Sequence, residues 1–210
     1  MEKAGTSLWC AELDWSAARM HFLKADPILH GLVSNLTNPP PSKGRSAFES
    51  LCRAIVGQQL SVKAASTIWH RLNELHCGAL TPETILAAKM EEHRNAGVSG
   101  QKHRYLMSLA TRYMAGPDDF NCVKDKSDEE IIERWTRVKG IGKWTVQMHL
   151  MFELNRPNVF PVDDLGIRRA MELHFGIARE SPKSTYEKRA LLWSPFRTAA
   201  CRFLWMSSDS

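Results

Sequence analysis

The sequence predicts an all-α protein built from two helical subdomains. Alternation of apolar and polar residues with a period of two, which marks a half-buried strand, is absent along the chain. About ten segments instead combine helical spacing of apolar residues with a capping residue at one end. A stretch rich in proline, at residues 38–44, has the composition of a linker and marks the first boundary between the subdomains.

Composition limits the kind of protein and its location. The chain has 210 residues, of which 43% are hydrophobic, and a net charge of +5. This is long enough for one large or two small domains with real cores, and the apolar fraction argues against disorder. The positive charge favours a polyanionic partner without establishing one. No signal peptide or apolar run of membrane length is visible, so we expect an intracellular protein without membrane contact, in the cytoplasm or nucleoid of a bacterium or the nucleus of a eukaryote.

The cysteines indicate a reducing compartment and no metal cluster. They are odd in number and widely scattered, without the close pairs that bind zinc. The five are Cys10, Cys52, Cys77, Cys122 and Cys201.

The first part of the chain has clear helix boundaries. Helical segments run from Leu13 to Leu36, interrupted at Asp26-Pro27, because proline is favoured at the first position of a helix. A helix after the linker ends near Gly57. Ser61 can then cap a helix whose apolar stripe is Val62, Ala65, Ile68 and Leu72.

The junction before Ser61 carries two glutamines and a leucine, Gln58, Gln59 and Leu60. By residue type alone such a junction is an ordinary polar turn. A later helix starts at Ser99 and ends at Gly116. Lys102 lies near its start, where a cation opposes the helix dipole. A phosphate contact would explain this placement, and a solvated surface lysine is the alternative.

The most informative stretch is a helix, a glycine turn and a second helix. Ser127 and Glu130 form a capping box for the first helix. The turn Lys139-Gly140-Ile141-Gly142-Lys143 follows, and its glycines let the backbone approach another molecule closely. The second helix is apolar on two faces, which predicts burial. Its first amides would bind an anion such as phosphate, although an ordinary helix corner would look the same.

Two adjacent carboxylates follow this unit and precede another helix, which runs from Leu165 to Phe175. We expect Asp163 to cap that helix through its side chain. One carboxylate is sufficient for a cap, so Asp164 requires another role. A final helix is expected from about Pro195 to Trp205.

Together these motifs resemble the helix-hairpin-helix DNA glycosylases with a Gly/Pro-Asp loop (HhH-GPD), specifically the 3-methyladenine DNA glycosylase II (AlkA-like) branch. The matching motifs are AIVGQQLS, VKGIGKWT, VFPVDD and WSPFRTAACRFLW, in that order over residues 47–205. The resemblance implies a central helical bundle at 47–150 that ends in the hairpin. Residues 1–46 and 156–210 would form the second subdomain, with the active site in the cleft between the two.

The resemblance also implies a reaction. It predicts a monofunctional DNA glycosylase of base excision repair, acting as a monomer on double-stranded DNA. The enzyme would flip an alkylated purine (3-methyladenine or 7-methylguanine) out of the helix and hydrolyse its N-glycosidic bond, leaving an abasic site. Bifunctional relatives carry a catalytic lysine where this chain has Trp144, so AP lyase activity should be absent.

The resemblance assigns roles to individual residues. Asp164 would be catalytic, because a carboxylate stabilises the positive charge that develops on the sugar. Gln59 would fill the gap left by the flipped nucleotide, supported by Gln58 and Leu60. The wider set of DNA-binding residues is Gln58, Gln59, Leu60, Ser61, Lys102, Lys139, Gly140, Ile141, Gly142 and Lys143.

The base pocket is expected to be aromatic. Trp144 and Trp193 would attract a positively charged base through their ring faces, although most of seven tryptophans in a helical protein are core residues. Trp193 precedes Ser194-Pro195, a placement that predicts exposure. Met148 and Leu165 stand where relatives can be aromatic, which makes the pocket less aromatic, and Asp163 adjoins it.

No cofactor is required by this reading, but a cation site is implied. In the family the hairpin carbonyls hold Na⁺ or K⁺ that bridges to phosphate, and the corresponding residues are Thr136, Val138 and Ile141. Two other functions remain open from the sequence. One is a non-catalytic helix-hairpin-helix DNA-binding module, and the other is a glycosylase for deaminated, oxidised or mismatched bases.

Overall fold

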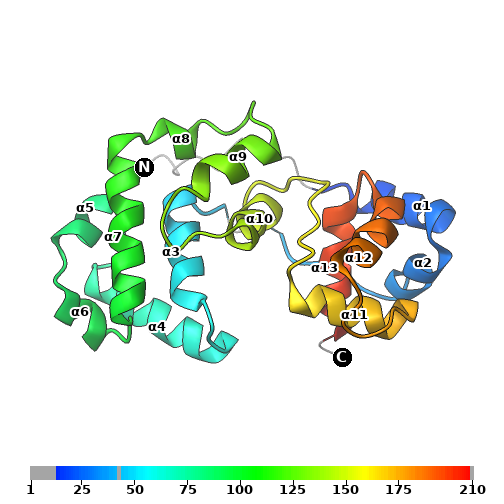
Figure 1. The fold of residues 1–210 in the computed structure, drawn as a ribbon, viewed down its shortest axis with the longest axis horizontal. Coiled ribbons are helices and arrows are strands. Elements are labelled where there is room, and N and C mark those ends of the chain that lie inside the picture. The colour runs from blue at the N-terminus through cyan, green and yellow to red at the C-terminus, as the bar shows by residue number, and fades with distance from the viewer. Residues whose placement is uncertain (1–12, 42–43, 209–210) are drawn as a thin grey trace, which may run out of the picture. The chain divides into compact units, whose positions relative to one another are not determined.

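The structure is a computed structural model of the 210-residue chain and describes residues 13–41 and 44–208. Within these ranges the regular structure consists of thirteen α-helices and one short 3-10 helix. Figure 1 shows the arrangement of the α-helices along the chain. The prediction of an all-α protein is confirmed. Cys10 and two residues of the predicted linker, Ser42 and Lys43, lie outside the described ranges. None of the described helices combines the length and the apolar character needed to span a bilayer.

The helices form two compact units, which are described separately. Unit 1 comprises residues 1–44 and 150–210, and unit 2 comprises residues 45–149. The boundary between them falls within α10 (Lys143–Phe152).

Most helices of unit 2 begin at a side-chain cap. In four of them a serine hydroxyl accepts the amide three residues further on, which satisfies one of the unpaired donors at a helix start. These serines are Ser46, Ser61, Ser99 and Ser127. The complete helices are α3 (Ala47–Gly57), α4 (Val62–Leu75), α5 (Pro82–Ala87), α6 (Met90–Asn95), α7 (Gly100–Ala115), α8 (Asp118–Asn121) and α9 (Asp128–Trp135).

The core of unit 2 lies around α3 and α7. Helix α7 packs against both α3 and α5, and it runs beside α3 in Figure 1. Leu51 and Ile55 of α3 and Leu106 and Leu109 of α7 are fully buried at these contacts. The stripe predicted for α4 is wrong at its first position, because Val62 is 89% exposed.

Unit 1 brings the beginning and the end of the chain together. Its helices are α1 (Trp15–Ala25), α2 (Pro27–Val33), α11 (Leu165–Phe175), α12 (Lys183–Ala190), the 3-10 helix η1 (Leu191–Trp193) and α13 (Arg197–Ser208). The expected boundary at Asp26-Pro27 is confirmed, since Asp26 caps α2 by accepting the amide of Leu29. The last helix starts two residues later than predicted, at Arg197.

The carboxylate of Asp26 is the centre of this unit's polar core. It is 1% exposed and accepts hydrogen bonds from Arg189 Nη2 at 2.6 Å and from Trp193 Nε1 at 2.7 Å. The indole of Trp193 is fully buried, with its ring against Phe160 and Phe175. The prediction that Trp193 is exposed is therefore wrong. The prediction that Trp193 lines the base pocket, which depends on that exposure, is wrong as well. A tryptophan buried with its N–H paired is a core residue.

Candidate active site and nucleic-acid interface

The glycine hairpin joins α9 to α10 and is held by two apolar side chains. Val138 and Ile141 are buried, and the Ile141 amide donates to the Val138 carbonyl at 3.0 Å. Lys139 and Lys143 are exposed on either side of the glycines. The hairpin thus combines an anchored backbone with two outward ammonium groups at the start of a helix, an arrangement that suits a phosphate.

The fold requires a glycine at only one of the two glycine positions in the hairpin. Gly140 has φ of +91°, and a Cβ there would lie 2.3 Å from the Tyr105 ring, so any side chain is excluded by both backbone and packing. Gly142 is exposed, and a Cβ there would meet no atom within 4 Å. Gly140 is therefore needed for the backbone conformation of the hairpin, whereas the absence of a side chain at Gly142 leaves the backbone accessible at the surface.

The carbonyls expected to hold a monovalent cation belong to this hairpin. Backbone carbonyl oxygens can coordinate K⁺ and similar ions. The Val138 carbonyl already accepts the Ile141 amide, and a carbonyl oxygen has a second lone pair. The Val138 carbonyl can therefore still bind an ion, and the cation site at Thr136, Val138 and Ile141 stays a prediction.

The loop between α3 and α4 is tied to the hairpin. Gln58, which is half-buried, donates from Nε2 to the Gly140 carbonyl at 2.8 Å. Gln59 is exposed and has φ of +57°, a conformation that non-glycine residues rarely adopt. Leu60 beside it is 39% exposed. The side chains of Gln59 and Leu60 are therefore accessible on the unit's surface, as their predicted role needs.

Lys102 has a partner inside unit 2. Its Nζ donates to the carbonyl of Val56 in the last turn of α3, at 2.7 Å, and burial lowers the pKa of this ammonium group. A cation at the C-terminal end of a helix satisfies a carbonyl and the helix dipole. This contact explains the unusual position of Lys102 without a phosphate.

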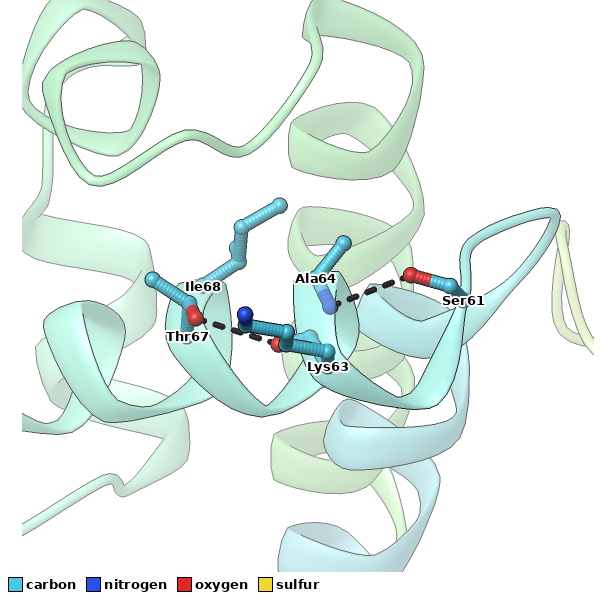
Figure 2. Close-up of a pocket in the computed structure, with 5 residues that line it drawn as sticks. All are labelled: Ser61, Lys63, Ala64, Thr67 and Ile68. Carbon is cyan, nitrogen blue, oxygen red and sulfur yellow. Dashed lines mark hydrogen bonds between the residues drawn. The ribbon is translucent and has the colours of Figure 1, made fainter.

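The first turns of α4 line a hollow, shown in Figure 2. Ser61 lies at one end of it and accepts the amide of Ala64 at 3.3 Å. Lys63 is exposed beside the capped start of the helix and accepts a hydrogen bond from Thr67 Oγ1 at its carbonyl. Ser61 thus has a local structural role as the helix cap, and Lys63 adds a cation near the Gln59 loop.

In unit 1 the helix cap is the second of the paired carboxylates and not the first. A turn in which the Asp164 amide donates to the Pro161 carbonyl brings Asp164 to the start of α11. Its Oδ1 accepts the amide of Ile167 at 2.9 Å, so Asp164 and not Asp163 is the helix cap. Asp163 points outward and forms an ion pair with Lys183. The expectation that Asp163 caps the helix is therefore wrong.

A second donor holds the same oxygen of Asp164. The indole Nε1 of Trp205 donates to Asp164 Oδ1 at 2.9 Å, and the indole stacks on Phe152 with ring centres 5.4 Å apart. A Cβ on Gly166 would lie 3.2 Å from this indole. Trp205 ends the C-terminal motif WSPFRTAACRFLW, but the sequence alone assigns it no role. The available signal was the motif's final tryptophan together with a glycine two residues after Asp164.

Helix α13 also fixes the loop that carries the carboxylates. Thr198 Oγ1 accepts the amide of Val159 at 3.0 Å, and the Thr198 amide donates to the Pro157 carbonyl at 2.9 Å. Asp164 itself is only 9% exposed. Burial of nearby Cys201, with the negative charge of Asp164 adding to it, raises the pKa of that thiol well above its ordinary value. The Asp164 carboxylate thus lies in a rigid, largely dry environment.

The other residues expected in the base pocket are accessible within their own units. Trp144 is 38% exposed and Met148 is half-buried, so α10 is not covered on both faces as predicted. Leu165, directly after Asp164, is 58% exposed.

Comparison with known proteins agrees with this geometry. Residues 52–195 match the model of the HhH-GPD superfamily of base excision DNA repair proteins. DNA-3-methyladenine glycosylase 1 of Schizosaccharomyces pombe is 36% identical over 197 residues, which cover 91% of this chain and 86% of that protein. The chain belongs to the HhH-GPD superfamily.

Solved structures are similar over most of their length. The S. pombe 3-methyladenine DNA glycosylase in complex with abasic DNA has a TM-score of 0.84 at 35% identity, covering 92% of this chain and 97% of that one. A DNA-3-methyladenine glycosidase from Bacillus halodurans has a TM-score of 0.80 at 32% identity, covering 92% and 89%. The predicted family is confirmed.

Proposed function

We propose that this protein is a monofunctional DNA glycosylase that removes alkylated purines, such as 3-methyladenine and 7-methylguanine, from double-stranded DNA. The observation that carries the proposal is the buried carboxylate of Asp164, held through one oxygen by the amide of Ile167 and the indole of Trp205. Its relatives named as 3-methyladenine glycosylases support the substrate class.

The chemistry follows from charge development during bond cleavage. As the bond between C1′ and the base nitrogen breaks, the sugar acquires positive charge, and a fixed carboxylate stabilises it without reorganising. Water then adds to C1′ and loses a proton, and the base leaves with the bonding electrons. A base already cationic through alkylation departs as a neutral molecule, so the barrier that Asp164 has to lower is smaller.

A hydrolytic rather than a lyase reaction follows from the residue at the hairpin helix. Strand cleavage by this family's bifunctional members needs an amine that attacks the sugar, and Trp144 stands at that position. Lys143, one residue earlier, is exposed among the phosphate-binding groups of the hairpin. When bound, a monovalent cation at Thr136, Val138 and Ile141 would add positive charge for a phosphate.

The experiment measures released base and strand breaks separately. Duplexes carrying 3-methyladenine, 7-methylguanine, hypoxanthine, uracil or 8-oxoguanine are incubated with the protein, and released bases are identified by chromatography. We expect methylated purines in the supernatant, alkali-labile sites in the DNA and no breaks before alkali treatment. Breaks without alkali would contradict the monofunctional reaction.

The same assay decides between the alternatives. Binding without release of any base would indicate a non-catalytic DNA-binding module. Release of uracil, hypoxanthine or 8-oxoguanine in preference to methylated purines would indicate a glycosylase for deaminated or oxidised bases. Either result would overturn the proposed substrate class.

A further inference from the structure

Two segments of unit 2, far apart in sequence, are joined by one hydrogen bond. Gln58 precedes the exposed Gln59, and its side-chain amide reaches the carbonyl of Gly140 in the hairpin at 2.8 Å. From the resemblance we expect Gln58 to contact DNA, but this bond turns its side-chain amide into the hairpin. The bond connects the segment expected to enter the DNA with the segment expected to bind its backbone.

Both ends of this bond are braced by α7. The Tyr105 ring fills the space beside Gly140, where a Cβ would lie 2.3 Å from it. Lys102, one turn earlier on the same helix, donates to the Val56 carbonyl just before the loop. The hairpin and the loop therefore rest on a common support, and the Gln58 side chain links them directly.

The hydrogen bond between Gln58 and Gly140 matters because the next residue, Gln59, has an unfavourable backbone conformation. Gln59 has φ of +57°, in the left-handed region that is unfavourable for a residue with a side chain. Such a conformation persists where its surroundings fix it. The Gln58 bond holds the residue immediately before it, so the direction of the Gln59 side chain depends on the position of Gly140.

We propose that Gln58 is a positioning residue that couples phosphate binding at the hairpin to insertion of Gln59 during base flipping. The inference rests on the proposed function. The amide that shares a peptide group with the Gly140 carbonyl is that of Ile141, and it already donates to the Val138 carbonyl. A phosphate bound by the other hairpin amides therefore acts by fixing the position of the Gly140 carbonyl. The Gln58 bond transmits that position to the loop and holds Gln59 in the orientation that fills the vacated space.

The test replaces Gln58 by methionine, which has similar length but no amide. Flipping is followed by the fluorescence of 2-aminopurine placed beside 7-methylguanine, duplex affinity by anisotropy, and excision by single-turnover release. We expect flipping and excision to fall about threefold to tenfold, the effect of one hydrogen bond, and to fall further than duplex affinity does. Equal losses in flipping and affinity, or wild-type flipping, would overturn the proposal.

Asn73→Leu is the matched control. The Asn73 amide donates to the Trp69 carbonyl at 2.9 Å within α4, so this variant loses the same kind of bond in the same unit without joining the two segments. We expect it to flip and excise like wild type. If flipping and excision fall equally in both variants, the effect of Gln58→Met is general destabilisation, and the proposed coupling is overturned.

Failure of the coupling is distinguishable from failure of the proposed function. If wild-type protein releases no methylated purine, the proposed function fails, and the fluorescence and affinity of the two variants still test the coupling. If wild type releases the base and Gln58→Met does so at the same rate, the coupling alone is wrong.

Discussion

The indole of Trp205 and the carboxylate of Asp164 share a 2.9 Å hydrogen bond across 41 residues of sequence. The same oxygen accepts the Ile167 amide, so two donors from two helices fix the plane of the carboxylate. Catalysis by a fixed charge depends on this kind of preorganisation. Trp205 is therefore a positioning residue whose contribution can be measured apart from that of Asp164.

Trp205→Phe should slow base excision while preserving the fold. Phenylalanine can keep the stacking on Phe152 but has no N–H for Asp164. A hydrogen bond to a charged group typically contributes more free energy than a hydrogen bond between two neutral groups. We therefore expect the single-turnover rate of base excision to fall on the order of tenfold. Release of 7-methylguanine under enzyme excess measures it.

Trp193→Phe is the matched control for Trp205→Phe. It also removes an indole hydrogen bond to an aspartate, but the partner is Asp26 in the core of unit 1. This variant should lower the free energy of unfolding, and its folded molecules should excise at nearly the wild-type rate. A larger rate loss for Trp193→Phe than for Trp205→Phe would refute the assignment of both residues.

Asp164→Asn should abolish base release with little loss of stability. Asparagine caps a helix about as well as aspartate, so α11 keeps its start, but the amide carries no negative charge. We expect excision to fall roughly 100-fold or more. Asp163→Asn loses an exposed ion pair with Lys183 and should change the rate little, since such pairs contribute little. An inactive Asp163→Asn beside an active Asp164→Asn would reverse the assignment.

The sequence predicts well what is decided within one helical turn. The caps at Ser61 and Ser127 and the boundary at Asp26-Pro27 are confirmed, because each depends on a bond to an amide three residues away. The family is also confirmed, since its hairpin and aspartate loop are short, ordered motifs.

Choices between neighbouring or chemically equal residues depend on contacts that residue type alone does not reveal. Asp163 and Asp164 could each cap α11, and a turn from Pro161 selects the second. The two tryptophans near the C-terminus differ in partner, Asp26 for Trp193 and Asp164 for Trp205. Asp26 lies 167 residues before Trp193 in sequence, so no local pattern could assign that contact.

The hairpin glycines should respond differently to alanine. Gly140→Ala places a Cβ against Tyr105 at a positive φ, so we expect a lower free energy of unfolding, by at least about 1 kcal/mol. Gly142→Ala meets open space and should fold like wild type, but its methyl group would stand where the backbone approaches phosphate. Its affinity should fall equally for damaged and undamaged duplexes, because phosphate contacts carry no base information.

Urea unfolding and fluorescence anisotropy separate these effects. A Gly142→Ala protein with wild-type affinity for both duplexes would show that this part of the hairpin does not approach DNA. A loss confined to damaged DNA would instead place Gly142 near the flipped base.

Stability should fall as the pH decreases, because of a buried chain of three histidines in unit 2. His93 is fully buried, with Nε2 3.3 Å from His76 Nε2 and Nδ1 2.8 Å from His103 Nδ1. Burial first, and then its two histidine neighbours, lower the pKa of His93 to about 4, although Glu92 acts in the opposite direction. The unfolded chain takes up this proton near pH 6.5, whereas the folded chain resists it.

The free energy of unfolding is therefore undiminished above pH 6.5 and decreases as the pH falls towards 4, by up to about 1.4 kcal/mol per pH unit for one such histidine. Burial also lowers the pKa of His149 to about 4, and it contributes with the same sign. Replacing His93 by glutamine keeps a hydrogen-bonding side chain but removes this titration, so the variant should lose part of the slope while the contribution of His149 remains. Urea denaturation at intervals between pH 7 and 4 measures both slopes, and identical slopes for wild type and His93→Gln would show that His93 is not the titrating group.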